Sequence, residues 1–189
     1  MKKDSYGGKL YKTMASQLGA SWRYATRGHN PLPLSKLIGK VHRFHLKDIS
    51  FDILSADRLV ALFKDGRVFS HFIEVWADQQ FSALSWVKDA RGYDFVEEAT
   101  GQKVDEKTFT KAGCRFCPSS MIGCGRHFDQ KVFDAHAAEL VYMLVDNTNF
   151  PKVSVRFERG RILAKAYPRG IIPYREKDKL FGAGKKIDG

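Results

Sequence analysis

Two aspartates and a lysine near the middle of the chain have side chains of the kind that phosphodiester hydrolysis needs. Asp94 is followed, after ten residues, by Asp105, Glu106 and Lys107. Carboxylate oxygens, with waters, are the ligands that Mg²⁺ prefers, and a bound metal ion neutralises a phosphate and lowers the pKa of its water. An ammonium group beside it can orient that water or stabilise developing charge. These residues predict a Mg²⁺ site held by Asp94 and Asp105, with the carbonyl of Glu106 as a further ligand and Lys107 as a catalytic residue.

A β-hairpin would bring these residues together. We expect a two-residue turn at Thr100-Gly101, which pairs Asp94 with Lys107 and places Asp105 on the diagonal. Side chains alternate between the two faces of a strand, so all three functional groups share one face. The opposite face would carry two apolar residues that suit a buried core, Phe95 and Val104.

The elements around the hairpin predict a mixed α/β (α+β) fold with a central β-sheet flanked by helices. The expected helices are 57–64, 69–81 and 129–139. The expected strands are 40–46, 92–98, 103–110, 140–145 and 153–157, with 161–167 extending the sheet. Glu74 lies in the second expected helix and is a candidate to assist the two aspartates.

The order Asp94, ten residues, then Asp105-Glu106-Lys107 resembles the PD-(D/E)XK nuclease superfamily, which contains most type II restriction endonucleases. The resemblance implies a restriction-endonuclease-like core, metal ligation by Asp94 and Asp105, and a catalytic role for Lys107. Many members add a glutamate from a preceding helix, a position that Glu74 could fill. Tyr93 stands where the family has its proline, and the second acid is the less frequent aspartate. The resemblance further implies a homodimer that cuts both strands of a palindrome.

All three cysteines fall in a Cys/Gly-rich loop, 111–128, directly after the second strand of the hairpin. Their spacing with one histidine is C-x2-C-x6-C-x2-H, a set that can bind zinc tetrahedrally: Cys114, Cys117, Cys124 and His127. The alternative is that they are reduced thiols in a loop. In a nuclease the same loop would contact DNA through basic and hydroxyl side chains: Lys111, Arg115, Ser119, Ser120 and Arg126. The other histidines, among them His45, His71 and His136, have no partner visible in the sequence and are interpreted as structural or surface residues.

Charge is distributed unevenly along the 189 residues, whose formal net charge is +11. Residues 1–47 carry ten Lys or Arg and one acid, residues 48–110 seven and twelve, and residues 111–189 fifteen and eight. A basic protein favours a polyanion such as double-stranded DNA, and the acidic middle favours a metal-dependent nuclease over a protein that only binds nucleic acid.

The length predicts one nuclease domain, 36–181, preceded by a basic arm, 1–35, and followed by a flexible tail, 182–189. With neither an apolar span nor a secretory signal in the sequence, we expect a cytoplasmic protein with no membrane association. The function predicted best is a Mg²⁺-dependent, sequence-specific type II restriction endonuclease. Two alternatives stay open, a repair, recombination or phage nuclease that recognises DNA structure, and a non-catalytic, zinc-stabilised nucleic-acid-binding protein.

Overall fold

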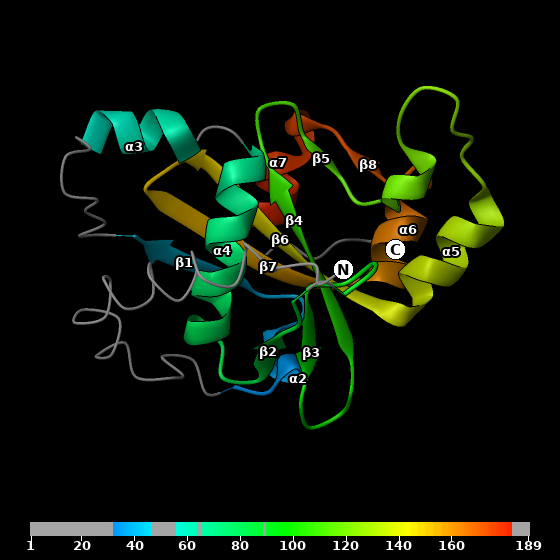
Figure 1. Cartoon of the computed structure of the whole chain (residues 1–189), viewed down its shortest axis with the longest axis horizontal. Helices are drawn as coiled ribbons and strands as arrows, with labels where there is room; N and C mark the ends of the chain where they lie inside the picture. Colours follow the sequence, from blue (N-terminus) through cyan, green and yellow to red (C-terminus); the bar gives the residue numbers. More distant parts are fainter. Residues whose placement is uncertain (1–31, 47–55, 64–65, 89, 183–189) are drawn as a thin grey trace, which may run out of the picture.

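A mixed six-stranded β-sheet organises the computed structural model, which describes residues 32–46, 56–63, 66–88 and 90–182 (Figure 1). The strands follow one another in space in the order β1-β7-β6-β4-β3-β2. Their bounds are β1 (Val41–His45), β2 (Leu84–Trp86), β3 (Phe95–Glu97), β4 (Lys103–Phe109), β6 (Leu140–Asn149) and β7 (Lys152–Arg159). All neighbours are antiparallel except β4 and β6, which are parallel. The predicted mixed sheet flanked by helices is thus confirmed.

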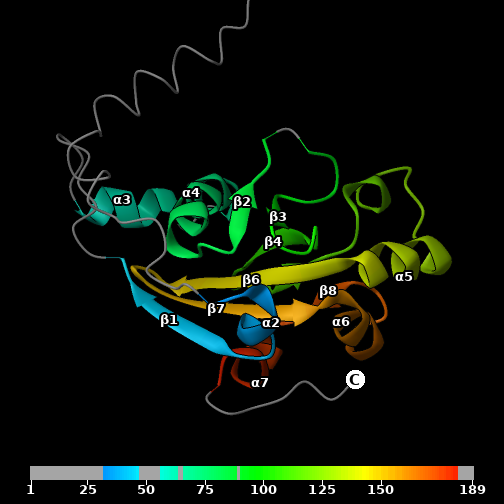
Figure 2. The same cartoon turned by 90° about the horizontal axis from the view of Figure 1, so that it is seen from below.

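Helices cover both faces of this sheet (Figure 2). On one face, α4 (Gly66–Gln80) contacts β4 and β2, beside α3 (Ala56–Phe63). At the other, α5 (Gln130–Glu139) and α6 (Gly160–Ala166) contact each other, and α7 (Lys177–Phe181) contacts β7. The short elements are α2 (Leu34–Leu37), the two-stranded sheet of β5 (Cys114–Arg115) and β8 (Ile171–Ile172), and the 3-10 turns η2 (Ser119–Met121) and η3 (Tyr174–Glu176).

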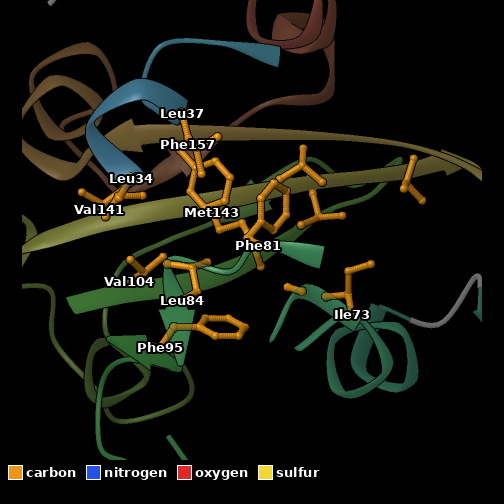
Figure 3. Close-up of a cluster of buried hydrophobic side chains, with 14 of the residues drawn as sticks. Leu34, Leu37, Ile73, Phe81, Leu84, Phe95, Val104, Val141, Met143 and Phe157 are labelled. Carbon is orange, nitrogen blue, oxygen red and sulfur yellow. The ribbon is translucent and has the colours of Figure 1, made fainter. Parts of the chain in front are cut away.

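Strand β6 separates two hydrophobic cores because apolar side chains point to both of its faces. Val141, Met143 and Val145 join the core under α4, which Figure 3 shows together with residues of α2, β2 and β3. Tyr142 and Leu144 join the second core, which also contains residues of α5, α6 and α7. A central strand buried on both faces fixes the place of its neighbour β4, which carries the predicted site.

The β3–β4 hairpin confirms the predicted pair of strands but has a different turn. Phe95 lies opposite Val104, and Val96 opposite Lys103. The backbone N–H groups of Thr100 and Gly101 both donate to the carbonyl of Glu97, at 3.3 and 2.8 Å, so the turn is longer than the predicted two residues. The predicted register was therefore wrong by two residues. Side chains keep their faces under a shift of two, and Phe95 and Val104 are both fully buried, as predicted.

The expected strand at 161–167 was wrong, because this segment forms helix α6. Gly160, Leu163 and Ala164 are its buried residues, and positions three and four apart lie on one side of a helix. Arg, Leu, Ala and Lys, which make up most of the segment, are also among the best helix formers. A Cβ atom on Gly160 would lie 2.1 Å from the carbonyl oxygen of Ala137, so only glycine permits this close approach of α6 to α5.

The predicted arm and tail fall mainly outside the described residues, which begin at Leu32 and end at Gly182. Leu34, assigned to the arm from the sequence, belongs to α2 and is buried in the core under α4. Its backbone N–H donates to the Glu97 carboxylate at 2.8 Å, which ties α2 to the hairpin. Among the described helices, none combines the length and the apolar character that a membrane crossing requires.

Candidate active site

Asp94, Asp105 and Lys107 line one open cleft of about 560 Å³ at the end of the β3–β4 hairpin. Asp94 lies just before β3, where its backbone N–H donates to the carbonyl of Val104 at 2.9 Å. Its carboxylate accepts the backbone N–H of Glu106 at 2.6 Å, since β3 does not extend far enough to pair with that part of β4. Asp94 is therefore held beside Asp105, and not opposite Lys107 as the two-residue turn predicted.

The two aspartates are close neighbours, and this affects the titration of Asp105. Burial raises the pKa of the Asp105 carboxyl from its ordinary 3.8 to about 7. The Lys107 ammonium opposes this rise, while the charge of Asp94 and a hydrogen bond between the two carboxyl groups add to it. Two neighbouring carboxyl groups hold oxygen atoms where one small cation could bind both of them.

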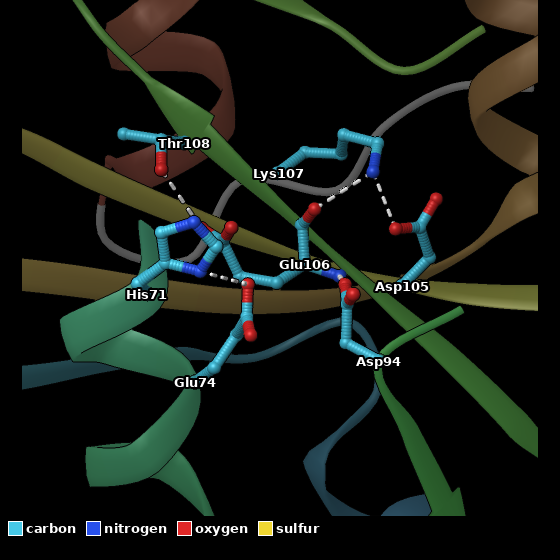
Figure 4. Close-up of polar contacts among 7 residues, drawn as sticks. All are labelled: His71, Glu74, Asp94, Asp105, Glu106, Lys107 and Thr108. Atoms are coloured by element: carbon cyan, nitrogen blue, oxygen red, sulfur yellow. Dashed lines mark hydrogen bonds and ion pairs between the residues drawn. The ribbon is translucent and has the colours of Figure 1, made fainter. Parts of the chain in front are cut away.

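The positively charged group beside the Asp105 carboxylate is the Lys107 ammonium (Figure 4). Its ammonium group donates to the Asp105 carboxylate and, at 2.8 Å, to the carbonyl of Glu106. Burial lowers the pKa of Lys107, but the carboxylate partners outweigh burial and leave the pKa above its ordinary value. The amine is therefore charged at neutral pH, and the Glu106 carbonyl, predicted as a metal ligand, is engaged by Lys107.

Glu74 and the Glu106 side chain lie on the side of strand β4 that faces α4, as Figure 4 shows. Burial raises the pKa of Glu74, and the Asp94 charge adds to the rise. His71 Nδ1 lies 3.9 Å from the Glu74 carboxylate. The Glu106 carboxyl is 4% exposed and accepts a hydrogen bond from the Thr108 hydroxyl at 3.0 Å. Helix α4 thus brings Glu74 towards Asp94, as the sequence predicts, but away from the face that carries Asp105 and Lys107.

Three of the five predicted DNA contacts lie in the cleft wall formed by the Cys/Gly-rich loop: Arg115, Ser119 and Ser120. Arg126 instead donates to the carbonyls of its own loop, at Ser119 and, at 2.9 Å, at Ile122. Lys111 is exposed but is not among the residues that line the cleft. The geometry therefore supports the loop as a wall of the site, with Arg115 as its cation.

The four candidate zinc ligands are not gathered in the structure. Cys114 and Cys117 are buried in the second core, and burial raises the pKa of both thiols. Cys124 and His127 are exposed. Across the described ranges, moreover, no three His, Cys, Asp or Glu side chains are grouped so as to hold a metal ion. The zinc site stays a prediction that this geometry does not support.

Two further residues line the cleft that the sequence did not predict there: Arg91, which no motif marks, and His136, which we interpreted as a structural or surface residue. Arg91 precedes the hairpin in a segment without a motif. His136 lies on α5, one helical turn after Val132, which also lines the cleft. Helix α5 begins where the sequence predicts, with the Asp129 carboxylate accepting the Val132 N–H at 3.0 Å. The spacing of four residues between Val132 and His136 places both on one side of this helix. The sequence did not show that this side faces the hairpin.

Comparisons with family models, with curated proteins and with solved structures found no match for this chain.

Proposed function

We propose that this protein is a Mg²⁺-dependent endonuclease that hydrolyses phosphodiester bonds in double-stranded DNA. One observation carries the proposal: two neighbouring carboxyl groups, from Asp94 and Asp105, and a charged amine, from Lys107, line one open cleft. The guanidinium groups of Arg91 and Arg115 line the same cleft and supply positive charge for a polyanion.

The donor set fits Mg²⁺ better than a softer metal ion. Asp94 and Asp105 offer only carboxylate oxygens, and Mg²⁺ commonly binds one or two carboxylates and keeps several waters. These two residues would hold the ion, and the Glu106 carbonyl would join them only where the Lys107 ammonium turns away from it. When bound, Mg²⁺ supplies a charge that neutralises the phosphate and makes a water more acidic.

The chain's own residues perform the remaining tasks. Lys107 holds its proton, so its ammonium can orient the attacking water and stabilise charge on the phosphate. Arg91 and Arg115 bind non-bridging phosphate oxygens, and the exposed Ser119 and Ser120 offer hydroxyl groups to the same backbone. Glu74 assists from the α4 side, next to Asp94.

The resemblance to the PD-(D/E)XK nucleases supports the same reading, with a sequence-specific type II restriction enzyme acting as a homodimer as its specific form. A nuclease that recognises DNA structure would use the same site. The non-catalytic, zinc-stabilised alternative is less favoured, because its ligands lie partly in the core and partly on the surface.

The experiment is incubation of purified protein with supercoiled plasmid, with Mg²⁺ or with EDTA. We expect cleavage only with Mg²⁺, and discrete bands if recognition is sequence-specific. Asp94→Asn and Lys107→Met should each reduce cleavage by at least about 100-fold while DNA binding persists. Asp178→Asn and Lys131→Met, which change exposed residues outside the cleft, serve as matched controls. Full cleavage by the two cleft variants would refute the proposal.

A further inference from the structure

His136 stands out among the cleft residues because its imidazole is available to a ligand. It is half-buried in the cleft wall that α5 forms. Within the part of the chain that the structure describes, the ring makes no hydrogen bond and no ion pair. A half-buried polar ring without a partner, in a cleft that two carboxyl groups and an ammonium also line, indicates a group kept for a substrate.

The backbone opposite His136 leaves space for the ring. A Cβ atom on Gly92 would lie 3.2 Å from Cε1 of His136, closer than a comfortable contact. Gly92 also has a φ of +85°, which side-chain-bearing residues rarely adopt. Glycine two residues before Asp94 therefore lets the imidazole approach the segment that carries the first carboxylate.

The ring lies within electrostatic reach of the amine but on a different wall. His136 and Lys107 line the same cleft. Burial lowers the pKa of His136, and the positive charge of Lys107 lowers it further. The neutral ring keeps one N–H donor. In a phosphoryl transfer the attacking and leaving oxygens lie roughly in line on opposite sides of phosphorus. With the water oriented at β4, the leaving oxygen faces away from β4.

We propose that His136 is a further catalytic residue, whose imidazole N–H donates a hydrogen bond to the 3′ oxygen that leaves the scissile phosphate. This inference rests on the proposed nuclease function, for which the resemblance to the PD-(D/E)XK nucleases implies a 5′-phosphate product and therefore a 3′ oxygen as the leaving group. The bond from the water oxygen to phosphorus forms, and the bond from phosphorus to the 3′ oxygen breaks. The water's proton passes to bulk solvent, and the leaving oxygen takes a proton from solvent after it has separated. His136 stabilises its negative charge meanwhile and undergoes no net change.

The test separates leaving-group assistance from a structural role. The ends of plasmid fragments are sequenced to locate a cleaved bond, and two duplex oligonucleotides containing that bond are made. One has the natural 3′ oxygen, and the other has sulfur in its place, a leaving group that needs no hydrogen-bond donor. The wild-type rate is compared with the rates of His136→Ala and His136→Gln on each duplex. His45→Ala, which removes an exposed histidine on β1, is the matched control.

We expect His136→Ala to cleave the oxygen duplex about 100-fold more slowly than wild type, as for loss of one donor to developing charge. On the sulfur duplex the two proteins should differ by less than about threefold. DNA binding in EDTA, measured by fluorescence anisotropy, and thermal unfolding should remain those of wild type. If the alanine variant does not fold, the same comparison of rates on the two duplexes is made with His136→Gln.

Equal losses on both duplexes, or no loss on either, would overturn the role of His136 and leave the nuclease proposal standing. Absence of Mg²⁺-dependent cleavage by the wild-type protein would overturn both.

Discussion

Replacement of Glu106 by glutamine should make the protein more stable at neutral and alkaline pH. The Glu106 carboxyl is 4% exposed, and burial raises its pKa from the ordinary 4.5 to about 8, although the Lys107 ammonium opposes the rise. Because the pKa is higher in the folded protein, folding is favoured while the group is protonated. This contribution is complete below the unfolded pKa of 4.5 and is lost as pH rises through about 8.

The size of this loss follows from the two pKa values. One pKa unit corresponds to about 1.4 kcal/mol, so the free energy of unfolding should fall by about 3–4 kcal/mol between about pH 5 and about pH 8. Glutamine has nearly the same shape and can accept the hydrogen bond that Thr108 donates to Oε1, but it does not ionise. The variant should therefore lack this part of the pH dependence and exceed wild type by a similar amount at about pH 8.

The assay is urea unfolding of both proteins, followed by tryptophan fluorescence, at several values between about pH 5 and about pH 8. Glu139→Gln is the matched control, because the Glu139 side chain is 70% exposed and its removal should leave the pH dependence of wild type intact. A constant difference between Glu106→Gln and wild type across this range would refute the reasoning. A Glu106→Gln variant that is less stable than wild type at about pH 8 would also refute it.

Two further predictions concern the second core and the cysteine loop. Gly160→Ala should lower the free energy of unfolding by about 3 kcal/mol, because the new methyl group would meet the Ala137 carbonyl, and an unchanged urea midpoint would contradict this contact. Cys124→Ser and His127→Ala should each leave the thermal unfolding temperature unchanged, and elemental analysis of the purified protein should find no stoichiometric zinc, since these exposed residues lie apart from the buried Cys114 and Cys117. Stoichiometric zinc lost in either variant would reverse that conclusion.

The hairpin illustrates how far local sequence can predict this fold. Alternation of polar and apolar residues gave the correct faces, with Phe95 and Val104 in the core and Asp105 with Lys107 on the opposite side. It did not give the register, since a shift of two residues preserves every face. The longer turn, and the capture of the Glu106 N–H by the Asp94 carboxylate, decided which groups meet.

The strand predicted for the segment after β7 was wrong for a related reason. Its apolar residues can follow a strand or one turn of a helix, and a short run does not distinguish the two. In the structure this segment packs against α5, where Gly160 closely approaches the Ala137 carbonyl, and such a tertiary contact is not visible in the local pattern. Local pattern predicted the longer elements α4 and α5 well, because their periodicity and, in α5, the Asp129 cap are contained within the segment itself.

The sequence by itself determined the types of chemical group present: two aspartates and a lysine at hairpin spacing, a glutamate in a preceding helix, and a basic loop directly after the hairpin. Only the tertiary structure decided that Asp94 lies beside Asp105, that Lys107 engages the Glu106 carbonyl, and that Arg91 and His136 share their cleft. The physical reason is that residue types and periodicity are local properties of the chain. The separation of charged groups depends on how α5, the cysteine loop and the hairpin pack around β4, and burial at that place then sets their pKa values.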